Sequence, residues 1–186
     1  MVSMTQLILP IVISAILVFI VAALVWMVAP HHKRDWKGLA NEDAVRSALN
    51  AMKPAPGMYM IPFAGTPQAR AEPSLVKKFE EGPVAYLTVR RSGSMSMGPM
   101  MVQSLIYYLV VSSIVGYLAI HALPIGSPYL KVFQVVGTAA WLAYGFGNVS
   151  ESIWFSKPWS SAFKQLFDSL LFAMVTAGAF GWRWPR

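Results

Sequence analysis

The chain has 186 residues, of which 56% are hydrophobic and only 12% are charged. Soluble domains usually carry about 25% charged residues, so a soluble fold of this size could not cover its apolar surface, and a bilayer is the expected solvent. The net charge of +7 indicates basic loops facing anionic lipid. No basic run alternates with stacking aromatic residues, which argues against a nucleic-acid partner. The chain has no cysteine, which excludes disulfides, thiolate metal sites and a cysteine nucleophile.

Four apolar segments are each long enough to cross a bilayer, which needs roughly 20 helical residues. They cover residues 6–29, 100–123, 130–149 and 162–182. Because lipid offers no hydrogen bonds to the backbone, these segments must be helices. The predicted fold class is an all-α membrane protein with four transmembrane helices. The first segment has basic residues after it and none before it, so we expect an uncleaved anchor and not a signal peptide.

Basic residues are distributed unevenly over the predicted loops. Twelve of the fifteen fall on the side that holds residues 30–99 and the third-to-fourth connection, and three fall on the other side. The positive-inside rule therefore predicts residues 30–99 in the cytoplasm and both termini on the opposite side of the membrane. The residues expected at the lipid headgroups are Lys33, Arg34, Lys37, Arg90 and Arg91.

The predicted domains are an N-terminal helix (1–29), a cytoplasmic segment (30–99) and a three-helix transmembrane bundle (100–186). Within the cytoplasmic segment, Asn41 and Ser74 can each cap a short helix, and residues 58–63 and 84–89 read as short strands. Two strands and two short helices make too small a core to be stable alone. We therefore expect this small α+β segment to pack on the membrane face or on another protein.

Small residues recur every four positions on the third and fourth predicted helices, and this spacing keeps them on nearly one face of each helix. Close approach through small residues is a main attraction between helices in lipid. The pattern predicts that these two helices pack together as antiparallel neighbours. The predicted contact residues are Ala139, Ala143 and Gly147 on one helix and Ala173, Ala177 and Gly181 on the other.

Few polar residues could form a site. Lys164 and Asp168 are four residues apart on one helix face, which predicts an ion pair, although a charge inside a membrane is also a functional-site candidate. Glu151 is expected on the same side, so Glu151 and Asp168 could form a proton or cation site. Trp141 falls near the middle of the third helix, where it could contact lipid, a partner helix or a cofactor carried by a partner.

The histidines do not predict a metal site. His31 and His32 are adjacent at a helix end, where neighbouring side chains point about 100° apart, so they are not expected to share one metal. His121 falls on the other side of the bilayer. Interfacial histidines beside a basic cluster are the simpler interpretation, and no catalytic, metal-binding or cofactor-binding motif is present.

A set of short stretches covers residues 31–36, 82–84, 87–89, 152–155, 158–159, 164, 168, 176–178, 180–182 and 184–185. In these stretches the chain resembles a family of uncharacterised small bacterial inner-membrane proteins with an aromatic-rich C-terminal transmembrane segment. The resemblance implies a bacterial cytoplasmic membrane, with both termini then in the periplasm, and implies no activity.

These observations favour a non-enzymatic accessory or structural subunit of a larger inner-membrane assembly, such as an electron-transfer complex. The expected partners are membrane lipid and other membrane protein subunits. The alternative is a small channel or transporter subunit with a polar site at Glu151 and Asp168.

Overall fold

A computed structural model describes residues 2–186 as two compact units. The helical unit comprises the chain up to Trp36 together with Ser96–Arg186, and the insert comprises Lys37–Met95. The helical unit contains η1 (Met4–Leu7), α1 (Ile8–Met27), η2 (Pro30–His32), α5 (Met97–Ala122), α6 (Tyr129–Gly145), α7 (Gly147–Trp154) and α8 (Trp159–Trp182). The insert contains α2 (Glu42–Met52), β1 (Gly57–Ile61), α3 (Pro67–Arg70), α4 (Pro73–Glu81) and β2 (Ala85–Val89).

The chain is mostly helical, as expected, but within residues 2–186 only two helical segments are long and apolar enough to cross a membrane. These are Met4–Met27 and Met97–Ala122. The predicted third helix is shorter than expected, because α6 ends at Gly145 and a separate helix, α7, follows. The fourth, α8, has sufficient length but contains Lys164 and Asp168.

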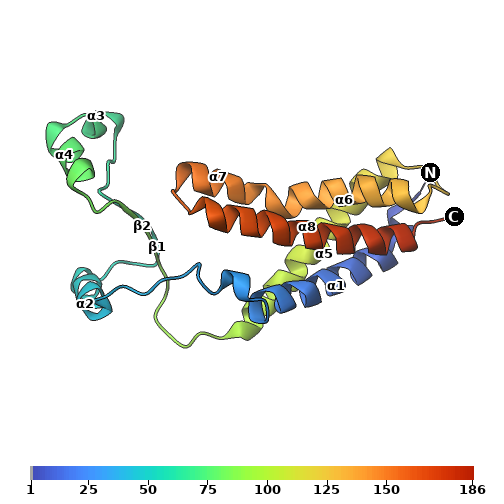
Figure 1. Cartoon of the computed structure of the whole chain (residues 1–186), viewed down its shortest axis with the longest axis horizontal. Coiled ribbons are helices and arrows are strands. Elements are labelled where there is room, and N and C mark those ends of the chain that lie inside the picture. The colour runs from blue at the N-terminus through green and yellow to red at the C-terminus, as the bar shows by residue number, and fades with distance from the viewer. Residues whose placement is uncertain (1) are drawn as a thin grey trace. The chain divides into compact units, whose positions relative to one another are not determined.

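The helices α1, α5, α6 and α8 lie side by side, with both ends of the described chain at one end of the bundle (Figure 1). The core consists mainly of small and β-branched side chains, such as Ala15, Val115, Val136 and Ala177, none more than 1% exposed. The buried side chain of Ser14 on α1 donates a 3.0 Å hydrogen bond to Ser112 on α5. Such a bond allows a hydroxyl to lie between helices in an apolar core.

Close contacts between α6 and α8 follow an antiparallel register. A Cβ atom at Gly137 would lie 3.3 Å from Ala177 Cβ, and one at Gly145 would lie 2.3 Å from Ser169 Oγ. At the other end of the pair, a Cβ at Gly181 would lie 2.7 Å from the Tyr129 ring. Glycine thus permits these two backbones to approach where a side chain would separate them.

Only some of the small residues predicted to form this contact lie in it. On α8, Ala173 and Ala177 are buried and Gly181 faces Tyr129. On α6, however, Ala139 is half-buried and Ala143 is exposed, while Gly147 has open space around it and belongs to α7. The prediction that Ala139, Ala143 and Gly147 form the contact on α6 is therefore wrong. Val132, Val136 and Ala140 are the buried residues, because the larger apolar side chains turn α6 toward the core.

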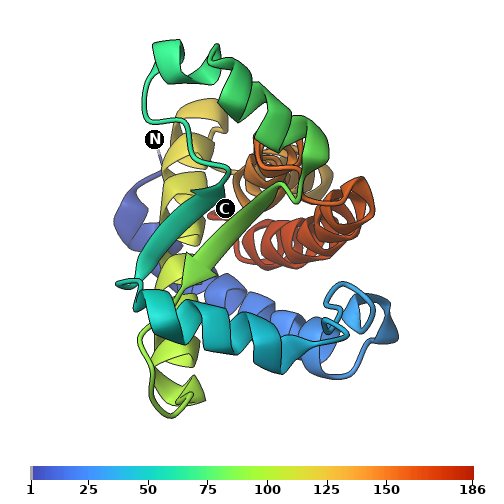
Figure 2. The same cartoon turned by 90° about the vertical axis from the view of Figure 1, so that its left-hand side faces the viewer.

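The insert is a two-stranded antiparallel sheet with short helices (Figure 2), in which Gly57 pairs with Val89 and Ile61 pairs with Ala85. Asn41 caps α2 through a bond from the Ala44 amide, as the sequence predicted. No residue between 37 and 95 is buried. The insert therefore lacks a hydrophobic core of its own.

Candidate functional site

The most concentrated polar group in the helical unit joins the segment after α1 to the first half of α8. It contains His31 and His32 from η2, Asp35 just beyond it, and Lys164 and Asp168 from α8. We call these five residues the His–Asp cluster. Pro30 at the first position of η2 starts a tight turn directly after α1, and this turn places both imidazoles against α8.

Asp168 is the centre of the cluster. Its side chain is 4% exposed and faces both histidines: His31 Nε2 lies 2.9 Å from one carboxylate oxygen, and His32 Nε2 lies 2.6 Å from the other. Asp168 is nine residues from the start of α8, or about 14 Å along a helix. A carboxylate at this depth needs partners to offset its loss of hydration, and the two imidazoles are those partners.

His32 contacts a second carboxylate, because its Nδ1 lies 2.7 Å from Asp35 Oδ2. Burial lowers the pKa of His32, but the bonds and charges of Asp35 and Asp168 outweigh burial, so its pKa is raised above the usual value of 6.5. Asp35 is also bonded by the Lys164 ammonium. The Lys164 bond, followed by the His32 bond, holds the pKa of Asp35 below its usual value.

The chemistry of the cluster follows from its donors and acceptors. An ionised carboxylate only accepts hydrogen bonds, so Nδ1 of His32 must carry the proton shared with Asp35. At 2.6 Å the Nε2 atom of His32 faces Asp168 as a donor, in an imidazolium. A bound cation would replace this proton and would move the two atoms apart to about 3–4 Å. The His–Asp cluster can therefore hold a proton or a cation between His32 and Asp168.

Two predictions about these residues are wrong. Lys164 does not pair with Asp168 along α8, because its ammonium bonds Asp35 from another part of the chain. The adjacent histidines do not diverge, since His31, His32 and Asp168 place donor atoms within 4.8 Å of one another. The 3₁₀ turn η2 does not itself align the two side chains, because it rotates neighbouring residues by about 120°. The ring nitrogens converge because both imidazoles reach the same carboxylate, that of Asp168.

The structure gives Glu151 and Asp168 separate partners. Glu151 pairs with Lys157 at an exposed position, whereas Asp168 is buried with the histidines. The indole N–H of Trp141 donates a 3.1 Å hydrogen bond to the Leu166 carbonyl on α8, so this polar group has a partner within the chain. All five predicted headgroup residues are exposed: Lys33, Arg34, Lys37, Arg90 and Arg91.

Sequence reasoning missed the contact between η2 and α8 because more than 130 residues separate its two sides. One signal was available. Asp168 is a carboxylate inside an apolar segment, and such a group requires a partner that can donate hydrogen bonds. His31 and His32 follow the first helix on the same predicted side of the membrane.

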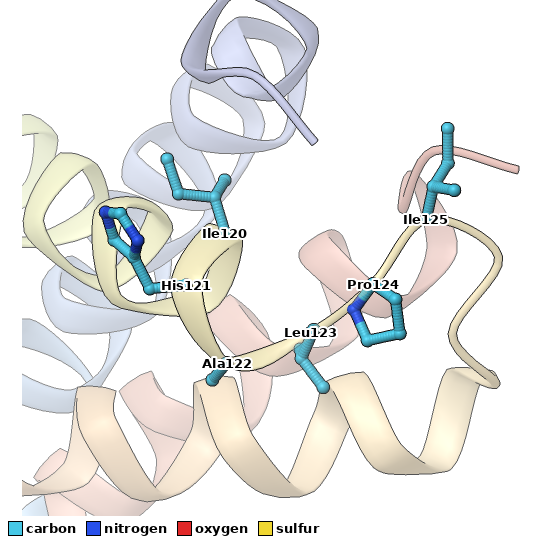
Figure 3. A pocket seen from close by; sticks show the side chains of 6 residues that line it. All are labelled: Ile120, His121, Ala122, Leu123, Pro124 and Ile125. Atoms are coloured by element: carbon cyan, nitrogen blue, oxygen red, sulfur yellow. The ribbon is translucent and has the colours of Figure 1, made fainter. Parts of the chain in front are cut away.

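The hollows at the opposite end of the bundle offer little chemistry. One is lined by residues 120–125, where the side chains point in different directions and His121 is the single ionisable group (Figure 3). His121 packs edge-on against the Tyr117 ring. The His–Asp cluster is therefore the better candidate site.

Comparison of the chain with protein-family models, with curated proteins and with solved structures finds no match. The features of the molecule that bear on its function are therefore the His–Asp cluster and the exposed surface of the insert.

Proposed function

We propose that this chain is a non-enzymatic subunit of a larger assembly in a bacterial inner membrane. The observation that supports this proposal most strongly is the insert, in which no residue from 37 to 95 is buried. A segment that buries no apolar side chain gains little to offset the entropy of its ordering. Docking on a partner protein would supply the missing burial.

The surface of the insert suits a protein partner better than an anionic lipid surface. Met52, Met58 and Phe63 are 67%, 76% and 74% exposed. Methionine and phenylalanine side chains are common at adaptable protein-binding surfaces. The five basic residues between residues 38 and 89 are matched by five acidic ones. The insert's net charge of +3 therefore comes from Lys37, Arg90 and Arg91 near its junctions with the helical unit, and the stretch between them has no net charge to attract anionic lipid.

The membrane-embedded part in this proposal is the bundle of α1, α5, α6 and α8. Exposed apolar side chains on its outer surface suit contact with lipid, for example Ile8, Leu24, Ile106 and Leu118, at 56%, 54%, 54% and 49%. The α6 helix has 17 residues, or about 26 Å, slightly less than the roughly 30 Å hydrocarbon core. Local thinning of the bilayer can accommodate this difference.

Topology is tested with alkaline phosphatase fusions, which are active only in the periplasm. The proposal expects activity for a fusion after Arg186 and none for a fusion at Arg70, because the basic residues are concentrated around the insert. The reverse pattern would refute the orientation. Inactivity of both fusions would refute an even number of crossings.

The assembly itself is tested by purification in mild detergent followed by mass measurement and identification of components. We expect one other membrane protein at fixed stoichiometry, and we expect Met58→Ser with Phe63→Ser to release it. Asp43→Ser is the matched control, because that side chain is also in the insert and is 93% exposed but is not apolar. Retention of the partner by the double variant would refute the role of the insert.

A small channel or transporter is the second candidate, and the buried His–Asp cluster is the observation that favours it. Ionisable residues within membrane bundles often line ion or proton pathways. This alternative predicts recovery of the chain as a pure homo-oligomer that conducts ions in vesicles, with conduction lost in Asp168→Asn. A fixed complex with a different protein would instead favour the subunit proposal.

A further inference from the structure

We propose that His31, His32 and Asp168 bind a divalent first-row transition-metal ion, with Asp35 orienting one of the ligands. This inference is independent of whether the chain is a subunit or a channel. Two imidazoles and one carboxylate are a ligand set suited to zinc(II), iron(II) or related ions. Magnesium and calcium prefer all-oxygen sites, so these ions are not expected here.

The geometry of the three donors supports a shared ion. One ring nitrogen of His31, one of His32 and one Asp168 oxygen all lie within 4.8 Å of one another. Two ligands at about 2.0–2.2 Å from one ion are about 3.4 Å apart in a tetrahedral site. The hydrogen-bonded pairs at 2.6 and 2.9 Å must therefore separate by less than about 1 Å, which small side-chain rotations allow. Three protein donors also leave a coordination position for water or another ligand.

Asp35 supplies the second observation that points to a metal. Histidines that bind metals commonly donate their other ring N–H to a carboxylate, which fixes the tautomer and the ring direction. His32 has this arrangement: Nδ1 lies 2.7 Å from Asp35 Oδ2, and Nε2 is directed at Asp168. Lys164 bonds the other oxygen of Asp35 and so keeps that carboxylate in place.

The surroundings hold the ligands while leaving an entry path. The Trp26 indole stacks on the His32 ring, with centroids 4.1 Å apart and planes 6° from parallel. This contact restricts rotation of the imidazole. The side chains of His32 and Asp168 are 5% and 4% exposed, whereas that of His31 is 30% exposed. An ion can therefore reach the cluster from the His31 side.

Zinc(II) alone is the probe. The full chain is purified in detergent with a histidine-free tag, stripped with a chelator and titrated by isothermal titration calorimetry. We expect one zinc(II) per chain, with affinity at least 100-fold lower in His32→Gln and in Asp168→Asn. Asp35→Asn should lower the affinity by about 10–100-fold, as loss of such an orienting carboxylate typically does. His121→Gln, which removes the histidine outside the cluster, should bind as the wild type does.

A second measurement separates metal binding from misfolding. Zinc(II) should raise the melting temperature of the wild type and of His121→Gln but leave that of His32→Gln unchanged, because an ion bound only to the folded chain stabilises it. Cobalt(II) should also quench fluorescence from Trp26, measured as the difference between wild type and Trp26→Phe. Absence of zinc(II) binding by the wild type would overturn the proposal and leave a proton-held cluster. Equal loss of binding in His121→Gln would also overturn it.

Discussion

Gly145 provides the sharpest test of the packing between α6 and α8. A Cβ atom at this position would lie 2.3 Å from Ser169 Oγ, 3.0 Å from Ser169 Cβ and 3.1 Å from a Leu166 methyl. The hydroxyl could rotate away, but it would lose its 2.7 Å bond to the Leu166 carbonyl. The Ser169 Cβ cannot move without displacing α8. Gly145→Ala should therefore force the two helices apart.

The expected magnitude combines two opposing effects. Overpacking a close contact costs about 1–3 kcal/mol, whereas replacing glycine by alanine in a helix gains about 0.5–1 kcal/mol. Gly145→Ala should thus lower the free energy of unfolding by about 1–2 kcal/mol. Gly147→Ala is the matched control, because it lies two residues away in α7 and has no atom within 4 Å of the added Cβ. That variant should be as stable as the wild type or slightly more stable.

Both variants are compared by thermal unfolding in one detergent, followed by intrinsic tryptophan fluorescence. Since 1 kcal/mol corresponds to about 2–4 °C for chains of 150–250 residues, Gly145→Ala should melt about 2–8 °C below the wild type and at least as far below Gly147→Ala. Ser169→Ala added to Gly145→Ala should recover part of the loss by removing the overlapping oxygen. A Gly145→Ala protein that melts at or above the wild-type temperature would refute the close approach of α6 and α8.

Three further outcomes are expected. Ala177→Leu should lower detergent stability by about 1–3 kcal/mol, because Ala177 is fully buried, while exposed Ala143→Leu should be tolerated; equal melting temperatures would contradict this. Lys164→Gln should cost about 1–3 kcal/mol by leaving the half-buried Asp35 charge without its cation, whereas Lys157→Gln should cost under about 1 kcal/mol because its ion pair is exposed; chemical denaturation compares the two. Trypsin should cut first within Lys37–Met95, where nothing is buried, and first cleavage in the bundle would refute that expectation.

Much of the architecture could be predicted from local patterns. The apolar runs that became α1, α5 and α8 were placed within a few residues of their observed bounds, because long apolar segments dominate the signal. Some caps and turns of the insert were also predictable from the sequence: Asn41 caps α2, and Gly82 follows the end of α4 with a positive φ of 64°, which glycine adopts readily. The predicted cap at Ser74 is wrong, because the residue at the cap of α4 is Glu72, two positions earlier.

The predictions that failed depend on tertiary contacts. The spacing of Ala139, Ala143 and Gly147 carries no information about which face of α6 the larger side chains Val136 and Tyr144 direct toward the core. The His–Asp cluster likewise required knowledge of how the chain turns after α1. A rule for the angle between neighbouring side chains in a helix does not show that both histidines of the short η2 turn reach the same carboxylate on α8.

The placement of the His–Asp cluster entirely within the helical unit has a consequence for how this chain can vary. His31, His32 and Asp35 precede the insert in the sequence, and their partners on α8 follow it, so the cluster is complete without any residue of the insert. Residues 37–95 can then be lengthened, shortened or exchanged without changing any residue of the cluster. The helical unit and the insert are therefore separate modules, free to diverge at different rates.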